Sequence, residues 1–131
     1  MADPRLLLET SLESVLDAAL TPAVFNTIAT GAFDYVVFTV VGSDDTWYNM
    51  KKRGYVYEYE VVGINRDRAT ALGYANALDT AMAAAEDSLS LVGYTVIEIR
   101  RVAVVDERDT LPDSGRIFRC GGRYEIELEE S

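Results

Sequence analysis

The stretch YVYEYEVVG, residues 55–63, constrains the fold more than any other segment of the chain. Successive side chains of a β-strand point to opposite faces of its sheet, so one face of this strand would carry Tyr55, Tyr57 and Tyr59. The other face would carry Glu58 and Glu60. Two interpretations stay open. Either the tyrosines face a core and the glutamates face water alone, or the glutamates form an acidic surface for a subunit, a partner or a lumen.

Length and composition predict one folded domain over residues 1–131. The chain is 49% hydrophobic and 26% charged, as expected for a protein with a buried core. No apolar run approaches the roughly 18–20 residues that a membrane span needs. The N-terminus has no basic start, and its apolar residues are interrupted at helical spacing, unlike a signal peptide. We therefore expect no membrane association, and assembly in the cytoplasm.

Residue types exclude several kinds of catalytic and metal site. The chain has no histidine and a single cysteine, Cys120, so it can form neither an internal disulfide nor a cysteine-based zinc site. Chemistry based on a serine–histidine or cysteine–histidine pair is excluded as well. Adjacent carboxylates such as Asp44 and Asp45 do not converge on one reacting atom. We therefore expect no catalytic residues, no metal and no cofactor, and we interpret Cys120 as a small core residue.

The net charge limits the partners of the chain. It is −10 at pH 7, with a pI near 4.3. Direct binding to a phosphate backbone needs a strongly basic patch, and the chain offers only MKKRG, residues 50–54, and scattered arginines. Two interpretations of the acidic balance stay open: it serves solubility alone, or it forms a surface that does not stick to nucleic acid.

The order of predicted elements indicates an α+β fold. Amphipathic periodicity predicts helices over residues 4–19 and 67–89. Runs rich in alternating, aromatic or β-branched residues predict strands over 33–41, 55–64, 94–107 and 116–130. The segment GSDDTW, residues 42–47, has the composition of a turn. The order helix-strand-strand-helix-strand-strand predicts a four-stranded, mostly antiparallel sheet with helices packed on one face.

Paired glycines interrupt the last predicted strand. Gly121 and Gly122 lie between residues that otherwise alternate between an apolar and a charged face. Since glycine weakens the interior of a strand, the pair indicates a bulge or a close approach of another backbone.

Two segments are candidate contact sites for a subunit or a partner. In the first, large side chains lie between two aspartates and a basic triplet: Asp44, Asp45, Trp47, Tyr48, Met50, Lys51, Lys52 and Arg53. The large side chains either pack over the end of the sheet or anchor an interface, where tryptophan, tyrosine and methionine are enriched. Charges of both signs would suit docking onto a neighbouring copy. The second segment contains Asp113 and Arg116 and is either an ordinary hairpin loop or a projection that contacts a partner ring.

Nearly the whole chain, from residue 5 to 129, resembles the tail-completion or tail-terminator family of long-tailed bacteriophages. Three segments carry the resemblance: FDYVVFTVV (33–41), YVYEYEVVGINRDRATALGYANAL (55–78) and DTLPDSGRIFRCGGRYEIELE (109–129). They are similar, in order, to the family's aromatic strand, to its second strand with the helix that follows, and to its closing hairpin. The segment TWYNMKKRG, residues 46–54, is longer and more basic than the family pattern, which indicates a specialised hairpin loop.

The resemblance implies a non-enzymatic virion assembly protein. Members of the family form a ring, often a hexamer, at the head-proximal end of the tail tube. The ring ends tube polymerisation and joins the tail to the head connector, while DNA passes through the lumen without being read. The implied partners are other copies of the chain, the tail tube protein and the connector or stopper protein, and the implied location is the virion tail. Glu58 and Glu60 would then face the lumen.

Two alternatives stay open beside a ring-forming terminator. One is a neighbouring connector or stopper protein, and the other is a small ligand-binding domain of ferredoxin-like type. A closed ring needs two complementary patches on each subunit, which separate acidic and basic segments or open sheet edges can supply. A protein that is monomeric at every concentration and has an apolar pocket would favour the ligand-binding domain.

Overall fold

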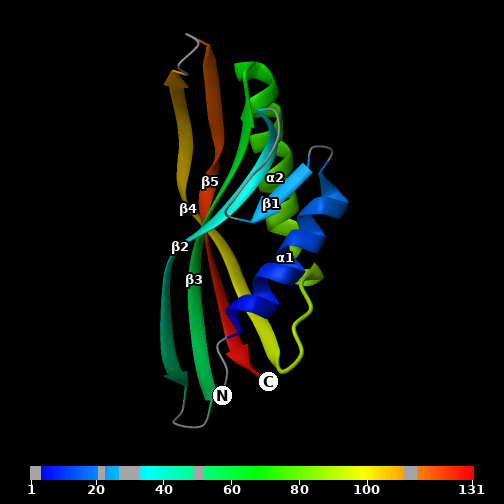
Figure 1. The fold of residues 1–131 in the computed structure, drawn as a ribbon. Helices are drawn as coiled ribbons and strands as arrows, with labels where there is room; N and C mark the ends of the chain where they lie inside the picture. Colours follow the sequence, from blue (N-terminus) through cyan, green and yellow to red (C-terminus); the bar gives the residue numbers. More distant parts are fainter. Residues whose placement is uncertain (1–3, 21–22, 27–32, 49–51, 111–114) are drawn as a thin grey trace.

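Two helices lie against one face of a long, twisted sheet in the computed structural model (Figure 1). The structure describes residues 4–20, 23–26, 33–48, 52–110 and 115–131. The elements, in chain order, are α1 (Arg5–Ala19), β1 (Ala23–Asn26), β2 (Asp34–Tyr48), β3 (Lys52–Asn65), α2 (Arg68–Ser88), β4 (Tyr94–Thr110) and β5 (Arg116–Glu130). Both predicted helices are confirmed, and the fold is broadly α+β.

The prediction of a four-stranded, mostly antiparallel sheet is wrong. The sheet has five strands in the order β1-β2-β3-β5-β4, and it is mixed because β1 runs parallel to β2. The other neighbouring strands are antiparallel. β1 has only four residues, too few to show a strand period in the sequence. It exists because its backbone pairs with residues 35–38 along the edge of β2.

β2 is longer than predicted, because the expected turn at residues 42–47 is part of the strand. This segment pairs residue by residue with the start of β3, where Gly42 lies opposite Glu58 and Asp44 lies opposite Val56. Turn-forming residues adopt an extended conformation here because a long partner strand supplies hydrogen bonds, and such context overrides local preference. The connection between β2 and β3 falls on residues 49–51, outside the described residues.

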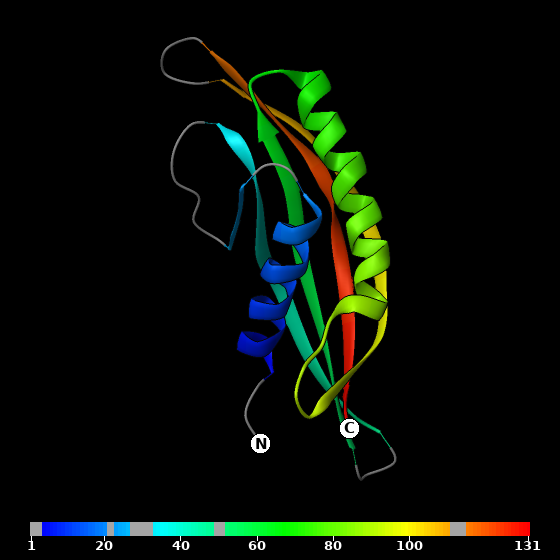
Figure 2. The ribbon, with the colours of Figure 1, turned by 90° about the vertical axis from the view of Figure 1, so that its right-hand side faces the viewer.

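Both helices form where apolar residues recur at helical spacing, and α2 also has a side-chain cap. Leu8, Leu12 and Leu16 recur every four residues on α1, and all three are buried. Asp67 caps the start of α2: its carboxylate accepts the backbone N–H of Thr70 at 3.1 Å and so satisfies one of the unpaired donors of the first turn. α2 covers β3, β5 and β4, while α1 packs against α2 and β1 (Figure 2).

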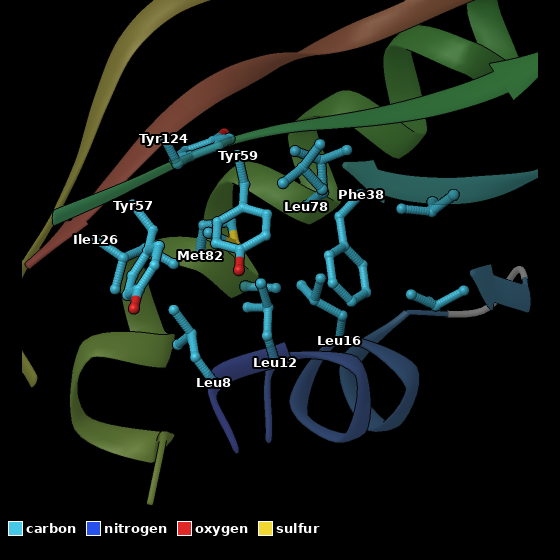
Figure 3. Close-up of a cluster of buried hydrophobic side chains, with 14 of the residues drawn as sticks. Leu8, Leu12, Leu16, Phe38, Tyr57, Tyr59, Leu78, Met82, Tyr124 and Ile126 are labelled. Atoms are coloured by element: carbon cyan, nitrogen blue, oxygen red, sulfur yellow. The ribbon is translucent and has the colours of Figure 1, made fainter. Parts of the chain in front are cut away.

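The tyrosine face of β3 forms the centre of the hydrophobic core. Tyr55, Tyr57 and Tyr59 are all buried. The rings of Tyr57 and Tyr59 point toward the leucines of α1, with Met82 of α2 close by (Figure 3). Burial of each such ring stabilises the fold by roughly 1.5–3 kcal/mol. The hydroxyl of Tyr59 donates to the carboxylate of Glu9 at 2.9 Å, so its polar end is satisfied.

Gly121 marks a close approach of the backbones of β3 and β5. A Cβ at this position would lie 2.0 Å from the carbonyl oxygen of Val61 and 2.8 Å from the Cα of Val62. Only a residue without a side chain fits there. The close approach predicted for the glycine pair is therefore confirmed, whereas the bulges of the described sheet lie in β2 and β4.

Candidate functional site

The sheet has an open face, on the side away from both helices (Figure 1). Glu58 and Glu60 lie on this open face, because the alternating tyrosines of β3 point into the core. In the register of the sheet they lie opposite Glu125 and Arg123 of β5. The uncovered position of the two glutamates agrees with the prediction from the sequence. That they line a lumen stays a prediction.

Glu60 is the centre of an ion-pair network on the open face. Arg119 donates from Nη2 to Oε1 of Glu60 at 2.8 Å, and Nε of Arg123 lies 3.5 Å from Oε2. Nη1 of Arg119 also lies 3.7 Å from Oε2 of Glu107. The side chain of Glu60 is only 15% exposed, so the two guanidinium groups offset the cost of removing its charge from water. Glu60 therefore contributes little net negative charge to the surface.

On one side of this network, toward the start of β4, the open face is acidic. Nη2 of Arg100 donates to Oε1 of Glu125 at 3.0 Å. Glu98 and Glu127 line a shallow hollow together with these two residues, and Glu58 lies opposite Glu125. The carboxylates of this group outnumber its one guanidinium, so this acidic end repels phosphate groups and attracts cations.

The other end of the open face is apolar. It holds a second hydrophobic cluster of buried residues, which are Val37, Val62, Ile64, Val105 and Ile117. The aromatic side chains of Phe25, Phe33 and Tyr35 pack against this cluster, and the guanidinium of Arg66 lies 5.4 Å from the centre of the Phe33 ring. The cluster could not be foreseen, because its members come from four strands that become neighbours only in the folded sheet.

On the helix-covered face, two buried tyrosines pair their hydroxyls with carboxylates. Tyr124 donates to Oδ1 of Asp79 at 2.7 Å, and Nη1 of Arg101 lies 3.4 Å from the same oxygen. Burial and the hydrogen bond to Asp79 raise the pKa of Tyr124 above its ordinary value. Burial and the bond to Glu9 raise the pKa of Tyr59 in the same way. Both phenols therefore stay protonated at neutral pH and act as hydrogen-bond donors rather than nucleophiles.

A shallow hollow of about 260 Å³ lies between α2 and β4. It is lined by Asp79, Met82, Ala83, Ile99, Arg101 and Tyr124, so its polar groups are already paired with one another. Within the described residues, no group of three or more carboxylate or thiol side chains is placed to hold a metal ion. No helix in that part of the chain is both long and apolar enough to cross a membrane.

The predicted contact residues lie at the two ends of the sheet (Figure 1). Six of them form the end of the β2–β3 hairpin, namely Asp44, Asp45, Trp47, Tyr48, Lys52 and Arg53. Arg116 begins β5 at the opposite end, where it pairs with Thr110. Met50, Lys51 and Asp113 lie outside the described residues. The structure thus separates the two candidate segments, and their contact with a partner stays a prediction.

The comparisons with known proteins give a likeness of fold. No family model matches the chain, and no curated protein matches it in sequence. Among solved structures, it is similar to a chain of the virion of a native gene transfer agent particle, with a TM-score of 0.54 and 19% sequence identity. The match covers 94% of this chain and 90% of that chain. At this identity the likeness shows a shared fold, which extends over nearly the full length of both chains.

Proposed function

We propose that the chain is a non-enzymatic virion assembly protein that forms a ring at the head-proximal end of a phage tail tube. The ring would end polymerisation of the tube and join the tail to the head connector. The observation that carries this proposal is the fold that the chain shares, over 94% of its length, with a chain of a gene transfer agent virion. The resemblance of its sequence to tail-terminator proteins supports the more specific role.

The positions of the two hairpins support a protein that lies between two different partners. The β2–β3 and β4–β5 hairpins extend to opposite ends of the sheet (Figure 1). Each hairpin carries charges of both signs: the first includes Asp44, Asp45, Lys52 and Arg53, and the second includes Glu107, Arg108, Asp109 and Arg116. A ring of such subunits would present one set of hairpins to the tail tube and the other set to the connector.

The acidic end of the open face supports a channel for DNA. Glu58 and Glu98 would repel the phosphate backbone, so DNA would pass along the channel without binding. Glu60 would add little to this repulsion, because its charge is shared with Arg119 and Arg123. The proposed lumen lining therefore depends on Glu58 more than on Glu60.

Assembly of the purified protein, with and without tail tubes, tests the proposal. Light scattering across a range of concentrations gives the solution mass, and negative-stain imaging shows the shape of any large species. Hexameric rings with a central hole would support the proposal, as would rings that form only on added tail tubes and stop their growth. A chain that forms no ring and leaves the length of growing tubes unchanged would contradict it and favour the ligand-binding alternative.

The orientation of the subunit in the ring tests the lumen assignment by itself. We expect α1 and α2 on the outside and the open face toward the hole. A ring whose hole is lined by the helices would refute the assignment of Glu58 to the lumen and leave the assembly role intact.

A further inference from the structure

The sheet ends in two free backbone edges, one on each side of the molecule. β4 is the outermost strand on one side. On the other side, β1 covers β2 only along residues 35–38. The outer edge of β2 from Thr39 to Tyr48 therefore has no strand beside it in the part of the chain that the structure describes. Free edges present N–H and C=O groups that pair readily with another strand.

At one point of the β4 edge, the chain itself supplies a hydrogen-bond acceptor. The backbone N–H of Ile99 donates to Oε1 of Glu86, on α2, at 3.1 Å. An N–H group that is bonded to α2 points away from β5, so this edge offers its backbone donors to groups outside the sheet. A carbonyl of a neighbouring strand can replace this single side-chain acceptor.

Both free edges expose valines at bulges. Val41, at the bulge in β2, is 45% exposed, and Val102, at the second of the two bulges in β4, is 40% exposed. Val104, just beyond the second bulge, is 69% exposed. The bulges at Val41 and Val102 lie at the same level of the sheet, next to the pair formed by Tyr59 and Tyr124. Apolar side chains that gather on both free edges indicate a surface that becomes buried against another strand.

We propose that β4 of one copy pairs with residues 39–48 of β2 in the next copy, so that the sheet continues from subunit to subunit. β2 and β4 run in opposite directions, because three antiparallel steps separate them. If the helices stay on one side of the continued sheet, the new pair is antiparallel. The two edges lie on opposite sides of each subunit, so the contact is head-to-tail and can close into a ring.

The charged residues of the two edges favour one register for the pairing of β4 with β2 of the next copy. If the two copies paired without any shift along the strands, Asp44 would lie opposite Glu98. Both residues belong to the row of the sheet that contains the Val56–Glu127 pair. A slip of two residues keeps every side chain on its own face. It brings Asp44 opposite Arg100, while Asp45 comes opposite Ile99. The slip also tilts the strands relative to the ring axis, as closed sheets require.

Residue size agrees with the same register. Val104 would lie opposite Val40, so the most exposed valine of the β4 edge would gain an apolar neighbour. Gly42 would lie opposite Ala103, between the two bulges, where small residues let the backbones approach. In this register the two strands therefore pair apolar residues with apolar ones, small residues with small ones, and an acidic residue with a basic one.

Disulfide cross-linking tests this contact with the variants Gly42→Cys and Ala103→Cys. A Cβ at Gly42 meets no atom within 4 Å, and Ala103 is exposed, so both variants should fold. In the double variant we expect oxidation to produce a ladder of covalent oligomers, because each copy offers one cysteine to each of two neighbours. An equimolar mixture of the single variants should stop at dimers, and each single variant alone should stay uncrosslinked.

The matched control combines Gly73→Cys with Ala103→Cys. Gly73 is exposed on α2, and a Cβ there also meets no atom within 4 Å, so this pair should give no ladder. Efficient dimers of Ala103→Cys alone would mean that two β4 edges meet, which would overturn the inference. The absence of a ladder in the variant with both Gly42→Cys and Ala103→Cys would overturn it as well.

Charge reversal tests the register. Arg100→Asp should weaken self-association at least about tenfold, because its carboxylate would then face Asp44. Mixing this variant with one that carries Asp44→Arg should restore assembly of the two together. Weakening without rescue would refute the register, as would a reversal without any effect.

The inference rests on the proposed function, because that function requires self-association, but the two can fail separately. Rings that act on tail tubes although the double cysteine variant gives no ladder would refute the β4–β2 contact and keep the proposed function. A ladder from a protein that has no effect on tail tubes would support the contact and contradict the proposed function.

Discussion

At the scale of single residues, Gly121 determines how closely β3 and β5 approach. The substitution Gly121→Ala would place a Cβ 2.0 Å from the carbonyl oxygen of Val61, so a backbone must move. We expect the free energy of unfolding, measured by urea denaturation, to fall by about 1–3 kcal/mol.

The control for this prediction is Gly73→Ala on the exposed side of α2. A Cβ at Gly73 meets no atom within 4 Å, and alanine is preferred over glycine inside a helix by up to about 1 kcal/mol. The control should therefore keep or raise the stability. If Gly121→Ala were as stable as Gly73→Ala, the close approach of β3 and β5 would not exist as described.

At the scale of elements, the ion pairs of Glu60 join three strands. Glu60 on β3 contacts Arg119 and Arg123 on β5, and Arg119 reaches Glu107 on β4. Such a network stabilises the sheet only when the strands pair in the correct register, because a slip of one strand would separate the charges. It therefore links the middle of the sheet to the hairpin of β4 and β5.

Replacement of the Glu60 carboxylate by an amide isolates this contribution. Glu60→Gln leaves the partly buried guanidinium of Arg119 without its main counter-charge, so we expect a loss of roughly 1–3 kcal/mol in the free energy of unfolding. Glu58→Gln, on the same strand and the same face, should change it by less than about 0.5 kcal/mol. Urea denaturation of both variants provides the measurement, and equal effects would contradict a special role for Glu60.

At the scale of the whole molecule, charge is unevenly distributed. The net charge is −10. In the described part of the chain, the carboxylates at the acidic end of the open face are not paired with the arginines that bind Glu60. The opposite end of that face is closed by the second hydrophobic cluster. The open face therefore combines an apolar end with an end that repels anions.

This distribution predicts that the chain does not bind DNA. Fluorescence anisotropy of a labelled duplex should stay unchanged on addition of the protein even at low salt, because binding to the backbone requires basic contacts that release counterions. Reversal of the acidic end by Glu58→Lys, Glu98→Lys and Glu125→Lys should create binding that weakens as salt is added. Salt-dependent binding by the unaltered chain would contradict the repelling surface.

Several features of the fold and of the candidate site follow from local patterns alone. The alternation in residues 55–63 predicts the buried tyrosine face and the uncovered glutamates, and the periodicity of Leu8, Leu12 and Leu16 predicts α1. These predictions succeed because period and burial are encoded within one segment. The absence of histidine and the single cysteine exclude whole classes of chemistry without any structure.

Other features were decided only by the tertiary structure, because they depend on which distant segments become neighbours. β1 is a strand only beside the edge of β2, and residues 42–47 are strand rather than turn because β3 pairs with them. The partners of Glu60 and the second hydrophobic cluster follow from the registers of β3, β4 and β5. The two free edges, on which the proposed contact between copies depends, follow from the strand order. A sequence encodes the period of each strand, but only the folded sheet determines which strands remain without a neighbour.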